Sequence, residues 1–139
     1  MTEFVLDNSV VAGWILLNQA TPYTQGIAQR LSSASACTPA IWELELTNVL
    51  RTACLRQKLD AQRAQQVLVQ IAQLPIEVDR HPVPRSELLA LALRFGLSTY
   101  DAAYLELALR RQLPIASVDQ ALCEAAMASG VGLISAQPS

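Results

Sequence analysis

The stretch EFVLDNSVVAGWILL, residues 3–17, joins a short apolar run to a polar turn and then to a second, longer apolar run. Residues 3–6 predict a short buried strand, because a brief apolar run that ends at a turn signal is typical of one. Asp7, Asn8 and Ser9 form the turn, and residues 10–17 predict a helix. A strand followed by a helix is the unit from which parallel sheets are built.

The same alternation continues along the chain. Further short strands are expected at residues 36–38, 76–78, 114–117 and 131–134. Helices are expected at residues 22–33, 41–57, 61–73, 85–95, 98–111 and 119–129. Apolar strands that alternate with helices imply a parallel sheet covered on both faces. We therefore predict an α/β fold, a three-layer α/β/α sandwich with a central, mostly parallel sheet, in a single domain over residues 1–139.

The composition is that of an ordinary folded domain. Hydrophobic residues make up 52% and charged residues 16%, a balance too apolar for disorder. No apolar run approaches the roughly 18 residues of a membrane span, and the first residues lack the basic segment of a signal peptide. The cysteines, Cys37, Cys54 and Cys123, form no CxxC pair. We therefore expect buried thiols and a cytoplasmic location without membrane contact.

The net charge of −2 does not by itself indicate nucleic-acid binding. Lys58 is the only lysine, and the other cations are arginines, which can hold a phosphate through two parallel hydrogen bonds. Each arginine can equally be a solvated residue of a helix face. The candidates for an RNA-binding face are Arg30, Arg51, Arg56, Arg110 and Arg111.

Four acidic residues lie close to the predicted ends of strands or the starts of helices. Asp7 directly follows the first strand, Asp119 lies two residues after the fourth, and Glu45 lies near the start of the helix that follows the second. Ligands of open α/β sheets bind outside the carboxyl ends of the strands, so these three are expected near one edge. Asp101 lies in the first turn of the helix before the fourth strand.

Each acid also has a purely structural interpretation. Asp7 and Asp119 can cap the helices that follow them, since aspartate is a preferred N-cap residue. Asp101 can complete a capping box with Ser98. Glu45 can be a solvated helix residue. The joint placement of the four, rather than any one of them, favours a functional site.

Carboxylates that converge repel one another unless a cation lies among them. Their oxygen atoms suit hard cations, here Mg²⁺ or Mn²⁺, which also bind the oxygens of a substrate phosphate. The only histidine is His81, in a loop, and no GxSxG, GxGxxG or Walker motif is present. An acidic site without histidine points to metal-dependent hydrolysis of phosphodiesters.

Four short motifs occur in an order that resembles the PIN-domain family. VLDNS at residues 5–9 resembles the opening D-x-S motif, and ELTNVL at residues 45–50 resembles the helical E-x-x-N-x-L motif. YDAAY at residues 100–104 resembles Y-D-A-x-Y. LPIASVDQAL at residues 113–122 resembles the closing stretch, with Ser117 in place of the common threonine.

The resemblance implies that Asp7, Glu45 and Asp101 carry the metal-binding carboxylates and that Asp119 is the fourth acid. It also places the start of the Asp101 helix at the same sheet edge. Glu43 competes for the glutamate role, but it lies about 200° around the helix from Glu45 and would point elsewhere. The residues expected to orient the carboxylates or to hold water are Ser9, Asn48 and Ser117.

The small size is similar to that of VapC-type toxins. This likeness implies an Mg²⁺- or Mn²⁺-dependent endoribonuclease, the toxin of a type II toxin–antitoxin pair. The partners it implies are RNA, a cognate antitoxin protein and a second copy in a homodimer. The low basic content departs from this expectation and leaves the RNA-binding face unassigned.

Other functions remain open at this point. One is a PIN nuclease of RNA processing without a toxin role. Another is a non-catalytic α/β signalling or binding module. A phospho-receiver needs an acidic pair after the first strand and a late lysine, whereas Asn8 follows Asp7 and Lys58 lies in a helical region. A haloacid-dehalogenase-like phosphatase needs a second aspartate where this chain has Ser9.

Overall fold

The computed structural model describes residues 2–136 and contains a four-stranded parallel sheet with the strand order β3-β2-β1-β4. The strands are β1 (Thr2–Leu6), β2 (Ala34–Pro39), β3 (Ile76–Asp79) and β4 (Ile115–Ala116). The helices of the first half are α1 (Asn8–Ile15), the 3-10 helix η1 (Leu17–Gln19), α2 (Pro22–Arg30), α3 (Ile41–Leu55) and α4 (Ala61–Ala72). Those of the second half are α5 (Arg85–Phe95), α6 (Thr99–Arg111) and α7 (Gln120–Ser129).

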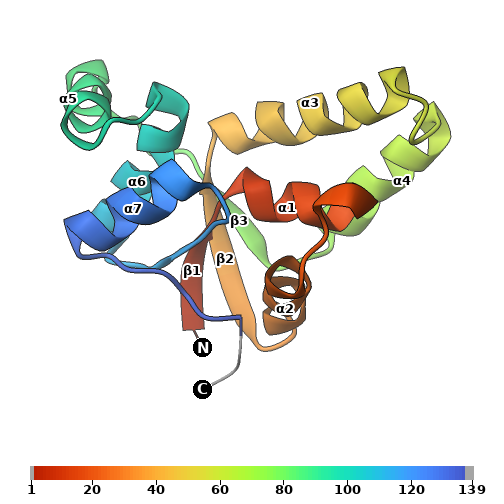
Figure 1. The fold of residues 1–139 in the computed structure, drawn as a ribbon, viewed down its shortest axis with the longest axis horizontal. Coiled ribbons are helices and arrows are strands. Elements are labelled where there is room, and N and C mark those ends of the chain that lie inside the picture. The colour runs from red at the N-terminus through yellow and green to blue at the C-terminus, as the bar shows by residue number, and fades with distance from the viewer. Residues whose placement is uncertain (1, 137–139) are drawn as a thin grey trace.

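The sheet lies between two groups of helices (Figure 1). Helices α1 to α4 lie on one side of it, and α5, α6 and α7 lie on the other. Helix α6 packs directly on β1 and β2 and is covered in turn by α5 and α7. These layers confirm the predicted α/β/α sandwich, and every strand pair is parallel.

The prediction of a fifth strand at residues 131–134 was wrong. Only one parallel bridge forms there, between Ile115 and Leu133. Gly130 and Gly132 adopt positive φ values of 90° and 77°, which extended strands do not contain. The segment therefore touches the edge of β4 without continuing the sheet.

Three helices also end two or three residues earlier than predicted, and one of them is α3, which was expected to reach residue 57 and ends at Leu55. The first helix ends at Ile15 rather than at residue 17, and η1 follows it after Leu16. The helix expected to reach residue 33 ends at Arg30, and β2 already begins at Ala34, earlier than predicted.

The position of β1 in the sheet determines the geometry of the site. It lies between β2 and β4, and its residues Phe4, Val5 and Leu6 have no exposed surface. Leu6 pairs with Ala116 of β4, so the next residues of both strands, Asp7 and Ser117, lie side by side at the carboxyl edge. The backbone N–H of Asp7 donates to the carbonyl of Ala116 at 3.0 Å.

Of the three cysteines, only Cys37 is fully buried, whereas Cys54 and Cys123 are half-buried, so the expectation of buried thiols was wrong for these two. All three are free thiols. Within residues 2–136, no helix combines the length and the apolar character needed to cross a membrane.

Candidate metal centre

Two serine hydroxyls hold the carboxylate of Asp7. Asp7 is buried, with 4% of its surface exposed. The Ser9 hydroxyl donates to Asp7 Oδ2 at 2.6 Å, and the Ser117 hydroxyl donates to the same oxygen at 2.8 Å. Ser9 Oγ accepts the Val118 N–H, and Ser117 Oγ accepts the Asp119 N–H. Asp7 occupies the N-cap position of α1, but its side chain forms no capping hydrogen bond.

Glu45 lies in the second turn of α3, where it is half-buried. The Tyr104 hydroxyl, on α6, donates to Glu45 Oε1 at 2.6 Å. Tyr104 has no exposed surface. Helices α3 and α6 lie on opposite sides of the sheet (Figure 1). This hydrogen bond therefore joins the two helix layers.

Asp101 and Asp119 lie at the starts of α6 and α7. Ser98 Oγ accepts the Asp101 N–H at 3.1 Å, and a hydrogen bond with the Ser98 side chain lowers the pKa of the Asp101 carboxyl. Asp119 does cap its helix, because its Oδ2 accepts the Leu122 N–H at 2.9 Å. The positive ends of these helices are a favourable environment for carboxylates.

The charges of the four acids act on one another. Burial is the largest cause that raises the pKa of Asp7 above its ordinary value of 3.8, and the charge of Asp119 adds to the effect. Burial also raises the pKa of Glu45, as do the charges of Asp7 and Asp101. For Asp101, burial and then the charges of Asp119 and Asp7 raise the pKa to about 6. Asp7 and Asp101 therefore each lie within electrostatic range of the other three acids.

No basic side chain within residues 2–136 forms an ion pair with these four acids. In the same part of the chain, no three Asp, Glu, His or Cys side chains converge closely enough, as they stand, to hold one metal ion. Among the described residues, no basic side chain therefore neutralises the four acids, and as they stand they do not form a complete set of metal ligands.

Comparisons with known proteins show the family and the fold. The PIN-domain family model matches residues 4–127, which is most of the sequence. The chain belongs to the PIN-domain family. A search of curated proteins finds no matching relative. The structure of this PIN domain is similar to the crystal structure of PAE2754 from Pyrobaculum aerophilum, with a TM-score of 0.71 and 19% identity. The match covers 89% of this chain and 84% of that one, and it shows a shared fold.

PIN domains are generally nucleases, which are hydrolases, and they typically use divalent metal ions. The four predicted acids of this PIN domain all lie at the carboxyl edge of the sheet or beside it. Their assignment as metal ligands stays a prediction. Glu43 points away from them and forms an ion pair with Arg80 at 2.9 Å, as its position around the helix implies.

The other residues predicted to support the site lie in different surroundings. Ser9 and Ser117 contact Asp7 directly. Asn48 is exposed, and its side chain forms no hydrogen bond with the described residues. Glu45 is contacted instead by Tyr104, which the sequence analysis quoted in a motif without giving it a role. Its spacing of three residues from Asp101 was the available signal, because such residues share a helix face.

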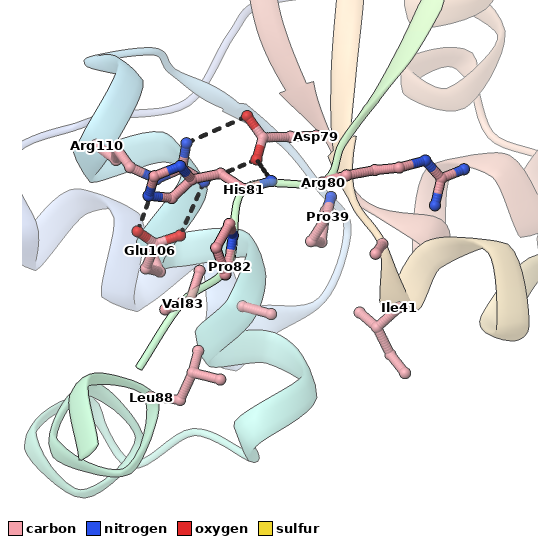
Figure 2. A pocket seen from close by; sticks show the side chains of 12 residues that line it. Pro39, Ile41, Asp79, Arg80, His81, Pro82, Val83, Leu88, Glu106 and Arg110 are labelled. Atoms are coloured by element: carbon pink, nitrogen blue, oxygen red, sulfur yellow. Dashed lines mark hydrogen bonds and ion pairs between the residues drawn. The ribbon is translucent and has the colours of Figure 1, made fainter. Parts of the chain in front are cut away.

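A pocket of about 350 Å³, which none of the four acids lines, lies between the start of α3, the loop after β3 and α6 (Figure 2). Arg110 donates to both Asp79 and Glu106 on its wall, and His81 lies exposed in the loop. Arg110 is thus engaged within the protein and is not a free RNA-binding cation.

Arg111, another predicted RNA-binding residue, is also engaged. It pairs with Glu3 at 2.9 Å and with Glu77 at 3.1 Å, and so ties the end of α6 to β1 and β3. Arg51 and Arg56 are exposed and form no ion pair with the described residues. They remain candidates for contact with RNA.

Proposed function

We propose that this PIN domain is an Mg²⁺- or Mn²⁺-dependent endoribonuclease whose metal ligands are Asp7, Glu45, Asp101 and Asp119. The observation that carries the proposal is the cluster of four acids, three of them with raised pKa values, that no basic side chain of the described residues neutralises. Such a cluster is costly unless a cation joins it. Membership of a family of nucleases gives the class of reaction.

The chemistry of the donor atoms fits a hard cation. All four side chains supply carboxylate oxygens, which Mg²⁺ and Mn²⁺ prefer. Glu45 Oε2 and Asp119 Oδ1 form no hydrogen bond within residues 2–136 and are available as ligands. Carboxylates without a basic partner repel one another, and a bound cation would remove that repulsion.

The protein's own groups hold and orient the acids. Ser9 and Ser117 fix one oxygen of Asp7, and Asp119 is fixed by its capping bond to α7. When bound, the divalent ion supplies Lewis acidity toward the phosphate and the attacking water. No side chain is needed as a nucleophile. The expected products carry a 5′-phosphate and a 3′-hydroxyl, whereas a 2′,3′-cyclic phosphate would contradict this mechanism.

We further propose that the nuclease is a VapC-type toxin of the cytoplasm, silenced by a cognate antitoxin and active as a homodimer. The four ordered motifs and the small size support this role. A PIN nuclease of RNA processing is the alternative. Growth arrest on expression, relieved by the product of an adjacent small gene, would favour the toxin. Expression without any effect on growth would favour the alternative.

The test of the nuclease is cleavage of total bacterial RNA by the purified chain with Mg²⁺, Mn²⁺ or EDTA. The Asp7→Asn variant is compared with Asp60→Asn, which alters an acid at the start of α4. We expect discrete fragments that require metal, persist with Asp60→Asn and vanish with Asp7→Asn. Cleavage that survives both EDTA and Asp7→Asn, or no cleavage by the folded protein under any condition, would refute the proposal.

A further inference from the structure

The hydrogen-bond partner of the buried Tyr104 hydroxyl is a carboxylate. A buried tyrosine hydroxyl usually finds a hydrogen-bond partner, and that of Tyr23 is a backbone carbonyl. Tyr104 instead donates to a carboxylate oxygen, Glu45 Oε1, at 2.6 Å, a length typical of strong charge-assisted hydrogen bonds. The backbone of Asn8, next to Asp7, also interacts with this hydroxyl. The phenol therefore lies between two of the proposed ligand positions.

The rigidity of the two partners differs. Tyr104 is fully enclosed on α6, where Leu105, Leu107 and Ala108 are buried with it. Glu45 is only half-buried, and a glutamate has several rotatable bonds that carry conformational entropy. A hydrogen bond between them restricts the glutamate far more than the tyrosine.

This hydrogen bond makes the two carboxylate oxygens of Glu45 different from each other. Oε1 is occupied by Tyr104, and Oε2 forms no hydrogen bond with the described residues. Asp7 is held in a similar way, because the hydroxyls of Ser9 and Ser117 both donate to its Oδ2. In both acids, hydroxyl groups fix one carboxylate oxygen.

We propose that Tyr104 is a positioning residue that holds Glu45 ready to bind the divalent ion through Oε2. The inference rests on the proposed function and adds a residue to it. Contacts of this kind, made to a ligand rather than to the metal, typically contribute 10- to 100-fold to metal affinity or activity.

The test is a double-mutant cycle on Mn²⁺ affinity, measured by calorimetry on the full chain. The variants are Tyr104→Phe, Glu45→Gln and the two combined. We expect Tyr104→Phe to weaken Mn²⁺ binding about 10-fold or more. We also expect the double variant to bind no more weakly than Glu45→Gln alone, because the hydroxyl acts only through that carboxylate. Unchanged affinity in Tyr104→Phe, or fully additive effects, would overturn the inference.

Tyr23→Phe is the matched control. The Tyr23 hydroxyl donates to the backbone carbonyl of Ile134 at 2.8 Å and also interacts with the backbone of Ser117, and it forms no hydrogen bond with a carboxylate of residues 2–136. We expect this variant to keep the Mn²⁺ affinity although it also loses a tyrosine hydrogen bond. Equal loss in both tyrosine variants would mean that Tyr104 has only a structural role.

RNA cleavage by the same variants separates this inference from the function on which it rests. A wild-type chain that neither binds Mn²⁺ nor cleaves RNA refutes both. A wild-type chain that cleaves RNA with metal, beside a Tyr104→Phe variant of unchanged affinity, refutes the role of Tyr104 alone. If Tyr104→Phe lowers kcat and leaves KM for RNA unchanged, the result supports both the proposed function and the role of Tyr104.

Discussion

The carboxylate of Asp7 has a different environment from that of an ordinary capping residue. Asp7 directly precedes α1, where aspartate commonly accepts a backbone N–H. Here its side chain accepts hydroxyl protons from Ser9 and Ser117 instead. Of the structural interpretations considered for the acids, capping therefore describes the Asp119 side chain and not that of Asp7 or Asp101.

Asp101 leads to a prediction about stability and pH in the absence of metal. Its pKa is raised from 3.8 to about 6, so the folded state holds the proton more tightly than the unfolded chain does. The resulting stabilisation is complete below pH 3.8 and is lost as the pH rises through about 6. Asp101→Asn, which is always neutral, should therefore be more stable than the wild type at neutral pH, by about 1 kcal/mol after solvent screening.

Thermal unfolding in EDTA at a series of pH values measures this difference. We expect Asp101→Asn to raise the melting temperature by about 3 °C at neutral pH and to have no such effect near the ordinary pKa of an aspartate. Asp60→Asn should show no comparable gain. A variant less stable than the wild type at neutral pH would contradict the electrostatic account of Asp101.

At the scale of elements, an aspartate at the start of a helix can cap that helix, belong to the candidate site, or do both. Asp119 caps α7 through a bond of 2.9 Å to Leu122, and Asp60 caps α4 through a bond of 2.7 Å to Arg63. Only Asp119 lies among the acids of the candidate site. The two caps therefore form a natural comparison.

We expect Asp119→Ala and Asp60→Ala each to lower the free energy of unfolding by about 1 kcal/mol, the usual cost of a lost N-cap. Asp119→Asn keeps an oxygen that can cap and should recover most of that loss. Urea unfolding measures the stability, and RNA cleavage measures the activity. Only the Asp119 variants should reduce metal-dependent cleavage, and full activity in Asp119→Ala would leave that residue with a capping role alone.

Helix α6 shows why some contacts could not be predicted from local pattern. Its residues 104 to 108 are all buried, because the helix lies between the sheet and the helices α5 and α7. A helix enclosed in this way has no solvent-facing stripe there whose spacing would reveal its orientation. The direction of Tyr104 toward Glu45 follows from the packing of the layers.

At the scale of the whole molecule, the negative charge at one sheet edge should couple folding to metal binding. A ligand that binds only the folded state stabilises it by about 2.7 kcal/mol at a hundredfold excess over Kd. We therefore expect Mn²⁺ to raise the melting temperature of the wild type by several degrees and EDTA to reverse the shift. Differential scanning calorimetry measures both.

The controls for this prediction are Asp7→Asn and Asp60→Asn. The first should lose the response to Mn²⁺, and the second should keep it. An equal response in Asp7→Asn would place the ion elsewhere on the protein, and no response in the wild type would argue against the proposed metal centre.

The sequence by itself determined the alternation of strands and helices, the α/β/α architecture and the family. These features can be predicted from local sequence patterns, because an apolar run, a turn signal and a capping residue act over a few neighbouring positions. The placement of Asp7 and Asp119 just after strands followed from the same patterns. The last predicted strand was wrong because Gly132, with a positive φ, interrupts it, and pairing with β4 then reduces to one bridge.

Only the tertiary structure decided which side chains meet. Ser117 reaches Asp7 across 110 positions of sequence, and Tyr104 reaches Glu45 across 59. It also showed that Arg110 and Arg111 are engaged in ion pairs, which their spacing does not reveal. The physical reason is that these contacts depend on strand order and on the packing of helix layers, and therefore on distances between elements that lie far apart in the chain.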